Sequence, residues 1–322
     1  MLTFKVLDLF SGMGGFSYGF ANEGFKTTGV DIKEVAGISY KKLTRGDFIL
    51  SDLRYDLIND KEYDIIIGGP PCRPWSSINI TKRGTEHPDY TLVLRFLAHI
   101  NYHRPKLFIM ENVPPLANDA ILSELISSTR KLGYSVDKVK VTYSNFGASV
   151  KRTRLIISGI LDSEISSFFW KMNSQTRKAK TVRDSIFYLQ DKEYGSVPDH
   201  VWPNLKTIRK YEKYYKTGKY GWRILKWEEP APSFGNVMKT YTLHPNSSFE
   251  RDYLRTISVA EAARIMGFPK GFIFPPNIPM GKRYQMIVDS VSPDFSSAIA
   301  KVAYNFLNGE LDYASGPKQY SS

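Results

Sequence analysis

Cysteine is almost absent from this sequence of 322 residues, since Cys72 is the only one. A single cysteine excludes a disulfide within the chain and a zinc site built from cysteines, and we expect no bound metal. Apolar runs are also short. None approaches the roughly 18 residues that a membrane-spanning helix needs, so we expect no contact with a membrane. The first residues lack the basic stretch and the cleavage site of a signal peptide, which predicts a cytoplasmic protein.

Acidic residues are outnumbered by basic ones, and this imbalance bears on the partner. The chain has 44 lysines and arginines against 32 acids, which gives a formal net charge of +12. Such a charge favours nucleic acid as the partner, although a basic surface that merely keeps a protein soluble would give the same count. The length allows either one large domain or two linked lobes with a sizeable core.

Short apolar runs alternate with helix-like stretches over the first 170 residues. The strand-like runs are 4–10, 26–30, 63–67, 106–110 and 155–160, and the main helical stretches are 16–23, 90–102 and 120–132. This alternation predicts an α/β fold with a doubly wound, mainly parallel sheet that is covered on both faces. In such sheets ligands bind at the carboxyl ends of the strands, and the polar residues of interest are clustered there.

A second, smaller lobe is predicted from a change in the sequence near residue 170. From about 171 to 250 the chain becomes irregular, basic and aromatic. Regular structure then resumes, because Ser258 and Glu261 have the spacing of a capping box at the start of a helix. A last helix is expected at 296–307. We therefore predict a first domain of residues 1–170, completed by 284–322, and a smaller domain with a hinge over 171–283.

The segment DLFSGMGGF at 8–16 joins the first strand to the first helix. Its three glycines lack the Cβ atoms that would keep a ligand away from the backbone. Asp31 ends the next strand, where an acid fits the hydroxyls of a ribose. The pattern suits NAD, FAD or S-adenosylmethionine, or a tight turn without a ligand, but its spacing is not the GxGxxG of a dinucleotide site. Asp52 ends another short run and either accepts from an adenine amino group or caps a helix.

The single cysteine follows a buried strand and two prolines, in the sequence GGPPC at 68–72. The prolines restrict the backbone and present the next side chain rigidly. The reactivity of a thiol depends on nearby positive charge or hydrogen-bond donors. Arg73 is adjacent, and we expect Arg152 and Arg154 to lie near in space. Cys72 is therefore a candidate nucleophile, and the other interpretation is a small buried apolar side chain.

These segments occur in an order that resembles the cytosine-C5 DNA methyltransferase family over nearly the whole chain. The similar segments are DLFSGMGGF (8–16), GGPPCRPWSS (68–77), ENVPPL (111–116), GASVKRTRLIISG (147–159), LRTISVAEAARIMGFP (254–269) and QMIVDSVSP (285–293). The resemblance implies a Rossmann-like methyltransferase fold, S-adenosyl-L-methionine as the cofactor and double-stranded DNA as the partner. It assigns catalysis and cofactor binding to the first domain and recognition of the DNA target to residues 171–283. The type is that of bacterial and archaeal restriction-modification systems, and we expect a monomer.

The resemblance also implies roles for individual residues. Cys72 adds to C6 of a cytosine that has been flipped out of the duplex, and Glu111 shares a proton with the ring N3. Arg154 holds the base O2, and Arg152 orients other site groups or the backbone. The implied cofactor residues are Asp8, Phe10, Ser11, Gly12, Gly14, Gly15, Asp31, Ile32, Asp52, Leu53, Pro70, Asp289 and Ser290. The expected DNA contacts are Arg73, Ser76, Lys82 and Arg83, in a polar segment, 75–90, that either closes over the DNA or is a solvated surface loop.

Three positions depart from the usual pattern of the family. Arg73 follows the nucleophile where glutamine is usual, and Ser149-Val150 precede the paired arginines where Pro-Gln is usual. Val288-Asp289 stand in the last segment where Gly-Asn is usual. The third departure concerns the amino-acid end of the cofactor, whose ammonium group would meet the acidic Asp289.

Other functions remain open from the sequence. A tRNA cytosine-C5 methyltransferase of the same superfamily would share the fold, but the common RNA enzymes use two cysteines, and a Cys-Phe-Thr element is absent here. A non-catalytic DNA-binding relative would also share it, and the altered last segment is the one feature that favours this alternative. An NAD-dependent oxidoreductase would explain the sheet and the turn but not Pro-Pro-Cys.

Overall fold

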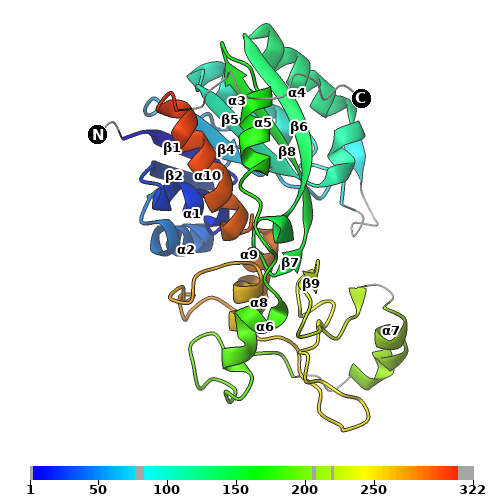
Figure 1. The fold of residues 1–322 in the computed structure, drawn as a ribbon. Coiled ribbons are helices and arrows are strands. Elements are labelled where there is room, and N and C mark those ends of the chain that lie inside the picture. The colour runs from blue at the N-terminus through cyan, green and yellow to red at the C-terminus, as the bar shows by residue number, and fades with distance from the viewer. Residues whose placement is uncertain (1–2, 77–82, 205–207, 219–220, 311–322) are drawn as a thin grey trace. The chain divides into compact units, whose positions relative to one another are not determined.

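A seven-stranded sheet organises the larger part of the chain in the computed structural model. Figure 1 draws its strands as arrows with helices packed beside them. Its strands are β1 (Lys5–Leu9), β2 (Lys26–Asp31), β3 (Asp47–Leu50), β4 (Ile65–Gly68), β5 (Leu107–Asn112), β6 (Tyr134–Thr142) and β8 (Thr153–Leu161). The order across the sheet is β3-β2-β1-β4-β5-β8-β6. The first five strands in this order pair in parallel, whereas β8 runs antiparallel to β5. The predicted mainly parallel α/β sheet is confirmed.

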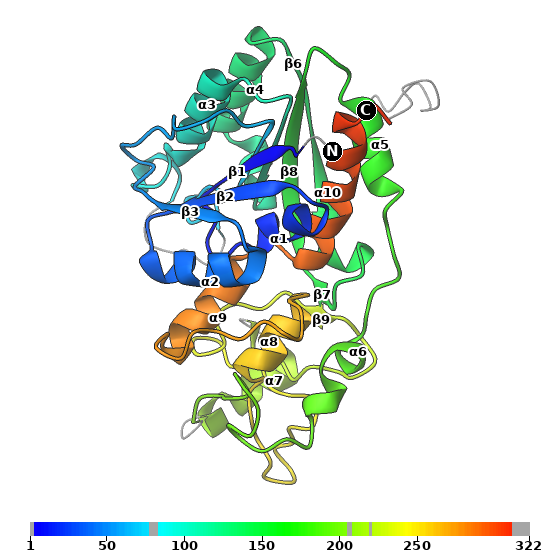
Figure 2. The same cartoon turned by 90° about the vertical axis from the view of Figure 1, so that its left-hand side faces the viewer.

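Helices cover both faces of this sheet, as the alternation of side chains along β1 requires. Leu7 and Leu9 point into a core cluster that also contains apolar side chains of α3 and α4. Asp8, between them, points to the opposite face, where its carboxylate accepts a hydrogen bond from Ser17 of α1. Figure 2 shows α3 and α4 on one side of the strands and α1 beside α10 on the other. The helices of this part are α1 (Gly15–Asn22), α2 (Glu34–Thr44), α3 (Leu92–His103), α4 (Ala120–Lys131), α5 (Ser166–Asn173) and α10 (Pro293–Leu307).

The last helix, α10, packs on α1 by a close approach of the two backbones. The Gly19 N–H donates to the Ser296 hydroxyl at 3.0 Å. A Cβ atom at Gly19 would lie 2.2 Å from the carbonyl carbon of Ser296, so a larger residue does not fit there. Tyr304 of α10 packs edge-on against Phe25. The chain therefore returns to the sheet after residue 292 and completes its helical cover.

Two compact units emerge from the contacts within the chain, of which the structure describes residues 3–76, 83–204, 208–218 and 221–310. Unit 1 is Met1–Val141, Thr153–Thr176 and Phe295–Ser322, and unit 2 is Thr142–Arg152 and Arg177–Asp294. These bounds differ from the predicted ones at 142–152, at 171–176 and at 284–294. In the first of these segments, β7 (Val150–Lys151) pairs with β9 (Ala231–Pro232) of unit 2. In the last, the Tyr284 hydroxyl donates to the Ile257 carbonyl at 2.8 Å.

Unit 2 is built from short elements around a buried ion pair. Its helices are α6 (Val182–Ile186), α7 (Glu212–Thr217), α8 (Val259–Ile265) and α9 (Met280–Asp289). The predicted capping box is present, because Ser258 Oγ accepts from the Glu261 N–H at 3.1 Å and Glu261 accepts from the Ser258 N–H at 2.8 Å. Arg255 donates to both carboxylate oxygens of Glu261 at 2.8 Å, which fixes the start of α8. Within the described ranges, no helix is long and apolar enough to cross a membrane.

Candidate active site

Most of the predicted functional residues lie at one edge of the sheet in unit 1. The register pairs Leu9 of β1 with Gly68 of β4, and Gly68 with Met110 of β5, so these parallel strands end side by side. The glycine-rich turn follows β1 and the cysteine segment follows β4. Glu111 lies at the end of β5, and Asp31 ends β2. The carboxyl edge of the sheet thus brings together segments that are far apart in the sequence.

Cys72 lies in a tight turn just beyond β4 and is partly buried. Its carbonyl oxygen accepts hydrogen bonds from the N–H groups of Trp75 and Ser76, both at 3.0 Å. The Pro70 carbonyl accepts from the Asn112 side chain at 3.0 Å, and Asn112 is 1% exposed. The cysteine segment is therefore held from within and is tied to the end of the neighbouring strand.

Glu111 and Arg154 form an ion pair beside this segment. Arg154 Nε lies 2.9 Å from Glu111 Oε1, and only 13% of each side chain is exposed. The antiparallel pairing of β5 with β8, which sets Glu111 opposite Ile156, brings the two charges together. A Cβ atom at Gly69 would lie 3.4 Å from Glu111 Oε2, so the chain that leads to Cys72 passes directly beside the carboxylate.

Arg152 belongs to unit 2, although only one residue separates it from Arg154. Its guanidinium donates to the Val288 carbonyl, and the residue is 9% exposed. Asp289 and Ser290, at the end of α9, also belong to unit 2, and their side chains make hydrogen bonds to the preceding turn at 2.7 and 2.9 Å. In this structure Arg152 therefore holds the backbone of the segment that contains Asp289 through a hydrogen bond.

The glycine-rich turn is anchored by Asp31. One carboxylate oxygen accepts a hydrogen bond from the Gly12 N–H at 3.0 Å, and the other accepts one from the Lys33 N–H at 3.0 Å. Gly14 has φ +89, and a Cβ atom there would lie 2.8 Å from the Tyr40 ring. Phe10 has φ +59, which is uncommon outside glycine and is a form of strain that clusters at functional sites. Of the predicted turn residues, Ser11, Gly14 and Gly15 are buried, and Phe10 and Gly12 are partly exposed.

Asp8 lies beneath this turn and not on its surface. It is 1% exposed, and its carboxylate accepts from the Ser17 hydroxyl at 2.7 Å, while the Tyr40 hydroxyl donates to Ser17 at 2.8 Å. Burial raises the pKa of Asp8 to about 7. A carboxyl group in this position connects β1 to α1 and supports the turn from below.

Asp52 lies just beyond β3 and is paired with Arg54. The guanidinium donates to Asp52 Oδ2 at 2.6 Å and to Oδ1 at 2.9 Å. The hydrogen bond from the Arg54 side chain holds the pKa of Asp52 below its usual value. Leu53, between them, is 3% exposed and packs in the core, so its side chain faces away from the surface.

The residues beside Asp31 fit a nucleoside. Ile32 is 51% exposed and Leu50, which pairs with Asp31 in the register of β2 and β3, is 57% exposed. Two exposed aliphatic side chains next to a carboxylate offer apolar surface for a flat base and an acceptor for ribose hydroxyls. Gly12 has open space where its Cβ atom would be, so a ligand can approach the turn there.

The predicted DNA contacts lie around the cysteine segment. Arg73 and Arg83 are exposed, and Ser76 is partly exposed. Lys82 lies outside the described residues. The Gly84 N–H donates to the Pro74 carbonyl at 2.9 Å, which brings the chain after Arg83 back to the cysteine segment.

Sequence reasoning missed a group of contacts around Asp119. The Trp75 indole and the Tyr90 hydroxyl both donate to its carboxylate, at 2.8 and 2.6 Å. An acid directly before the helical stretch at residue 120 is a recognisable N-cap signal, and its side chain does accept from the Ile121 N–H. No sequence signal pointed to the two donors, because they come from distant parts of the chain.

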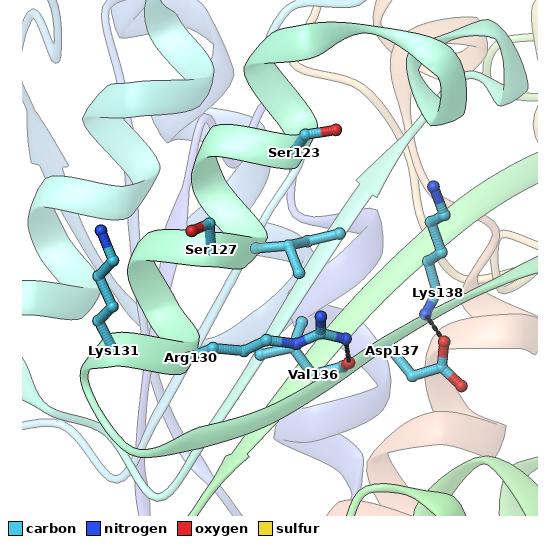
Figure 3. Close-up of a pocket in the computed structure, with 8 residues that line it drawn as sticks. Ser123, Ser127, Arg130, Lys131, Val136, Asp137 and Lys138 are labelled. Atoms are coloured by element: carbon cyan, nitrogen blue, oxygen red, sulfur yellow. Dashed lines mark hydrogen bonds between the residues drawn. The ribbon is translucent and has the colours of Figure 1, made fainter.

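A groove elsewhere in unit 1, shown in Figure 3, contains none of the predicted site residues. It lies between α4 and β6, the edge strand of the sheet, and Ser123, Ser127, Arg130, Lys131 and Lys138 are among the residues that line it. The Arg130 guanidinium donates a hydrogen bond to the Val136 carbonyl at 3.0 Å. The candidate site therefore rests on the carboxyl edge of the sheet and not on this groove.

Known proteins share matches with this chain over most of its length. A family model described as C-5 cytosine-specific DNA methylase matches residues 4–305. The type II methyltransferase M.FnuDI of Fusobacterium nucleatum is 28% identical over 324 residues, which cover 92% of this chain and 93% of that protein. The type II methyltransferase M.NgoPII of Neisseria gonorrhoeae is 29% identical over 326 residues, with 92% and 94% covered.

Solved structures show the same fold. The Dnmt2 methyltransferase of S. pombe superposes with a TM-score of 0.75 at 18% identity, over 95% of this chain and 99% of that one. The methyltransferase EhMeth of Entamoeba histolytica gives the same TM-score, identity and coverage. The family match covers nearly the whole chain and includes every segment on which the resemblance rested. The chain therefore belongs to the C-5 cytosine-specific DNA methylase family.

Proposed function

We propose that this protein methylates C5 of cytosine in a specific double-stranded DNA sequence, with S-adenosyl-L-methionine as cofactor and Cys72 as covalent nucleophile. The observation that carries the proposal is the Glu111–Arg154 pair, which lies beside the segment that presents Cys72. Family membership supports the same reaction. Two relatives, M.FnuDI and M.NgoPII, are type II methyltransferases, which supports a role in restriction-modification.

Cys72 carries out the activating step of the reaction, which is needed because C5 of cytosine is a weak nucleophile. Its thiolate sulfur forms a bond to C6, and the electron pair of the C5–C6 double bond becomes available at C5. The cofactor, when bound, supplies an electrophilic methyl group for C5. Water then takes the C5 proton, and the electron pair of that C–H bond reforms the C5–C6 double bond while the Sγ–C6 bond breaks, which restores the aromatic ring and the thiolate.

Glu111 and Arg154 prepare the ring for this addition. Addition at C6 pushes negative charge toward N3 and O2, so Glu111 shares a proton with N3 and Arg154 donates to O2. The 2.9 Å contact between the two side chains holds both at the end of β5 before the base arrives. The pair is thus preorganised for charge that develops only during the reaction.

The cofactor is placed at the glycine-rich turn. Asp31 accepts from the ribose hydroxyls, and Ile32 and Leu50 cover the base. Asp52 accepts a hydrogen bond from the adenine amino group, and this requires the loss of part of its contact with Arg54. Asp289 and Ser290 take the amino-acid end, as the sequence predicts.

DNA binding completes the proposal. The target base is inaccessible inside a duplex, so it must leave the stack at a cost of a few kcal/mol. Arg73, Ser76 and Arg83 contact the backbone near the flipped base, and the basic, aromatic chain of unit 2 reads the target sequence. Phosphate contacts make this binding strongly dependent on salt.

Bisulfite sequencing of DNA from cells that express the protein tests the function. We expect C5 methylation within one sequence context, and none with the Cys72→Ser protein. Methylation of tRNA alone would support the RNA alternative, and DNA binding without methylation would support the non-catalytic one. Purified protein should also be trapped covalently by DNA with 5-fluorocytosine at the target, because fluorine does not leave as a proton does. A Cys72→Ser protein that still methylated at the normal rate would refute the mechanism.

A further inference from the structure

One carboxylate in unit 1 joins three separate parts of the chain. Asp119 Oδ2 accepts from Trp75 Nε1 at 2.8 Å. Asp119 Oδ1 accepts from the Tyr90 hydroxyl at 2.6 Å and from the Ile121 N–H at 3.0 Å. We call these contacts of Asp119 with Trp75 and Tyr90 the Asp119 clamp. Its members are 15 to 44 residues apart in the sequence, so it is a tertiary feature.

The clamp connects the two segments that carry the proposed chemistry. Trp75 is in the turn that begins at Cys72, and its N–H donates to the Cys72 carbonyl at 3.0 Å. Asp119 follows Glu111 through β5's end and one short 3₁₀ helix, Pro114–Asn118. Movement of Asp119 relative to Trp75 would therefore change the spacing between the thiol segment and the glutamate segment.

The surroundings of the clamp make it rigid. Trp75 is 5% exposed, and its ring packs against the Tyr90 ring with centroids 5.6 Å apart. Burial opposes the charge on Asp119, but the hydrogen bonds from Tyr90, Ile121 and Trp75 outweigh it and lower the pKa of Asp119. The carboxylate therefore stays ionised near neutral pH and acts only as an acceptor, which suits two neutral donors.

We propose that Asp119, through Trp75 and Tyr90, is a positioning residue that sets the separation and orientation of Cys72 and Glu111. This inference rests on the proposed function. C6 and N3 lie at opposite corners of one rigid ring, so the substrate dictates how far apart the two protein groups must be. A misplacement of about 1 Å costs about 10²-fold in rate, although no clamp side chain touches the base.

Three variants separate the clamp from the helix cap. Asp119→Ser keeps a cap acceptor for the Ile121 N–H but cannot hold both donors, while Trp75→Phe and Tyr90→Phe each remove one donor. For Asp119→Ser we expect the single-turnover methylation rate to fall roughly 10- to 100-fold, with DNA and S-adenosyl-L-methionine dissociation constants within about threefold of wild type. The two Phe variants should show smaller losses of the same kind.

Alkylation of Cys72 by iodoacetamide gives a second readout that needs neither DNA nor cofactor. Since Cys72 is the only thiol, the rate of alkylation reports on its segment alone. A loosened segment exposes the thiol, so we expect Asp119→Ser to be alkylated at least about threefold faster. Tyr134→Phe is the matched control, because it removes a tyrosine hydroxyl bond of 2.7 Å to the Pro105 carbonyl in the same unit.

The outcomes distinguish the clamp from the function on which it rests. Asp119→Ser protein that matched Tyr134→Phe in both methylation and alkylation rates would overturn the clamp and leave the function standing. Wild-type protein that failed to methylate DNA would overturn the function, and the alkylation rates would still decide whether Asp119 holds the Cys72 segment. If the loss of methylation rate among the variants were proportional to their loss of DNA affinity or of thermal stability, this would also count against a positioning role.

Discussion

Replacement of Glu111 by alanine should destabilise the protein even before DNA or cofactor is added. The change removes the carboxylate that faces Arg154 Nε at 2.9 Å, at a place where only 13% of either side chain is exposed. A guanidinium in such a position keeps its charge and has lost most of its hydration. The variant should therefore have a lower free energy of unfolding, because its folded state contains an uncompensated, mostly buried charge.

The magnitude follows from this partial burial. Removal of one partner from a fully buried pair costs about 3–5 kcal/mol, and residual exposure reduces this to about 2–3 kcal/mol here. Glu111→Gln keeps an oxygen that can accept from Arg154, so its cost should be only about 1 kcal/mol. The double variant Glu111→Ala/Arg154→Ala removes both charges and should recover at least about 1 kcal/mol relative to Glu111→Ala alone.

Urea unfolding followed by circular dichroism measures these differences on the free protein. Single-turnover methylation then separates structure from chemistry, because Glu111→Gln should slow the reaction roughly 10²- to 10⁴-fold while it stays almost as stable as wild type. Equal stability of Glu111→Ala and Glu111→Gln would refute the argument from the ion pair. Methylation by Glu111→Gln within about threefold of the wild-type rate would refute the proton role of Glu111.

Three further predictions rest on other parts of the structure. Asp31→Ala should weaken S-adenosyl-L-methionine binding by about 1.5–3 kcal/mol in calorimetry, since a charged acceptor is lost, and unchanged affinity in a folded protein would remove Asp31 from the site. Gly19→Ala should cost at least about 1–3 kcal/mol in urea unfolding, because the new Cβ atom would lie 2.2 Å from the Ser296 backbone. Gly271→Ala, where a Cβ atom has open space, is its control, and equal effects would contradict the packing argument. Burial lowers the pKa of His99 from 6.5 to about 4, so below pH 6.5 the unfolded chain binds a proton that the folded protein does not. The contribution of His99 alone should lower the free energy of unfolding by about 3 kcal/mol from pH 6.5 to 4, and His99→Gln should reduce the slope of the profile accordingly, whereas an unchanged slope would contradict it.

Much of the fold could be predicted because it depends on local patterns. The apolar run at 106–110 is bounded by a proline and an acid, and the segment at 26–30 ends before an acid, and the structure places β5 and β2 there with shifts of one or two residues. The capping box at Ser258 is equally local, because it joins residues three apart. Alternation of strands with helices then leaves few topologies other than a parallel sheet with its site at the carboxyl edge.

The family and the proposed nucleophile were also within reach of the sequence. Cys72 follows a strand and two prolines, and Glu111 ends another strand, so each signal lies within a few residues of one chain segment. The contact between Glu111 and Arg154 was not visible in this way. It depends on the antiparallel pairing of β8 with β5, which no local pattern specifies.

Only the tertiary structure decided how side chains from distant segments share space. Arg152 and Arg154 are two residues apart, yet Arg152 lies between β7 and β8, Arg154 lies in β8, and they belong to different units. Asp119 joins Trp75 and Tyr90, which are 44 and 29 residues away in the sequence. Residue type and spacing determine backbone conformation and which face is apolar, because these depend on neighbours along the chain. The partner of a charged or polar side chain depends on where the rest of the chain passes, and that is known only when the fold is complete.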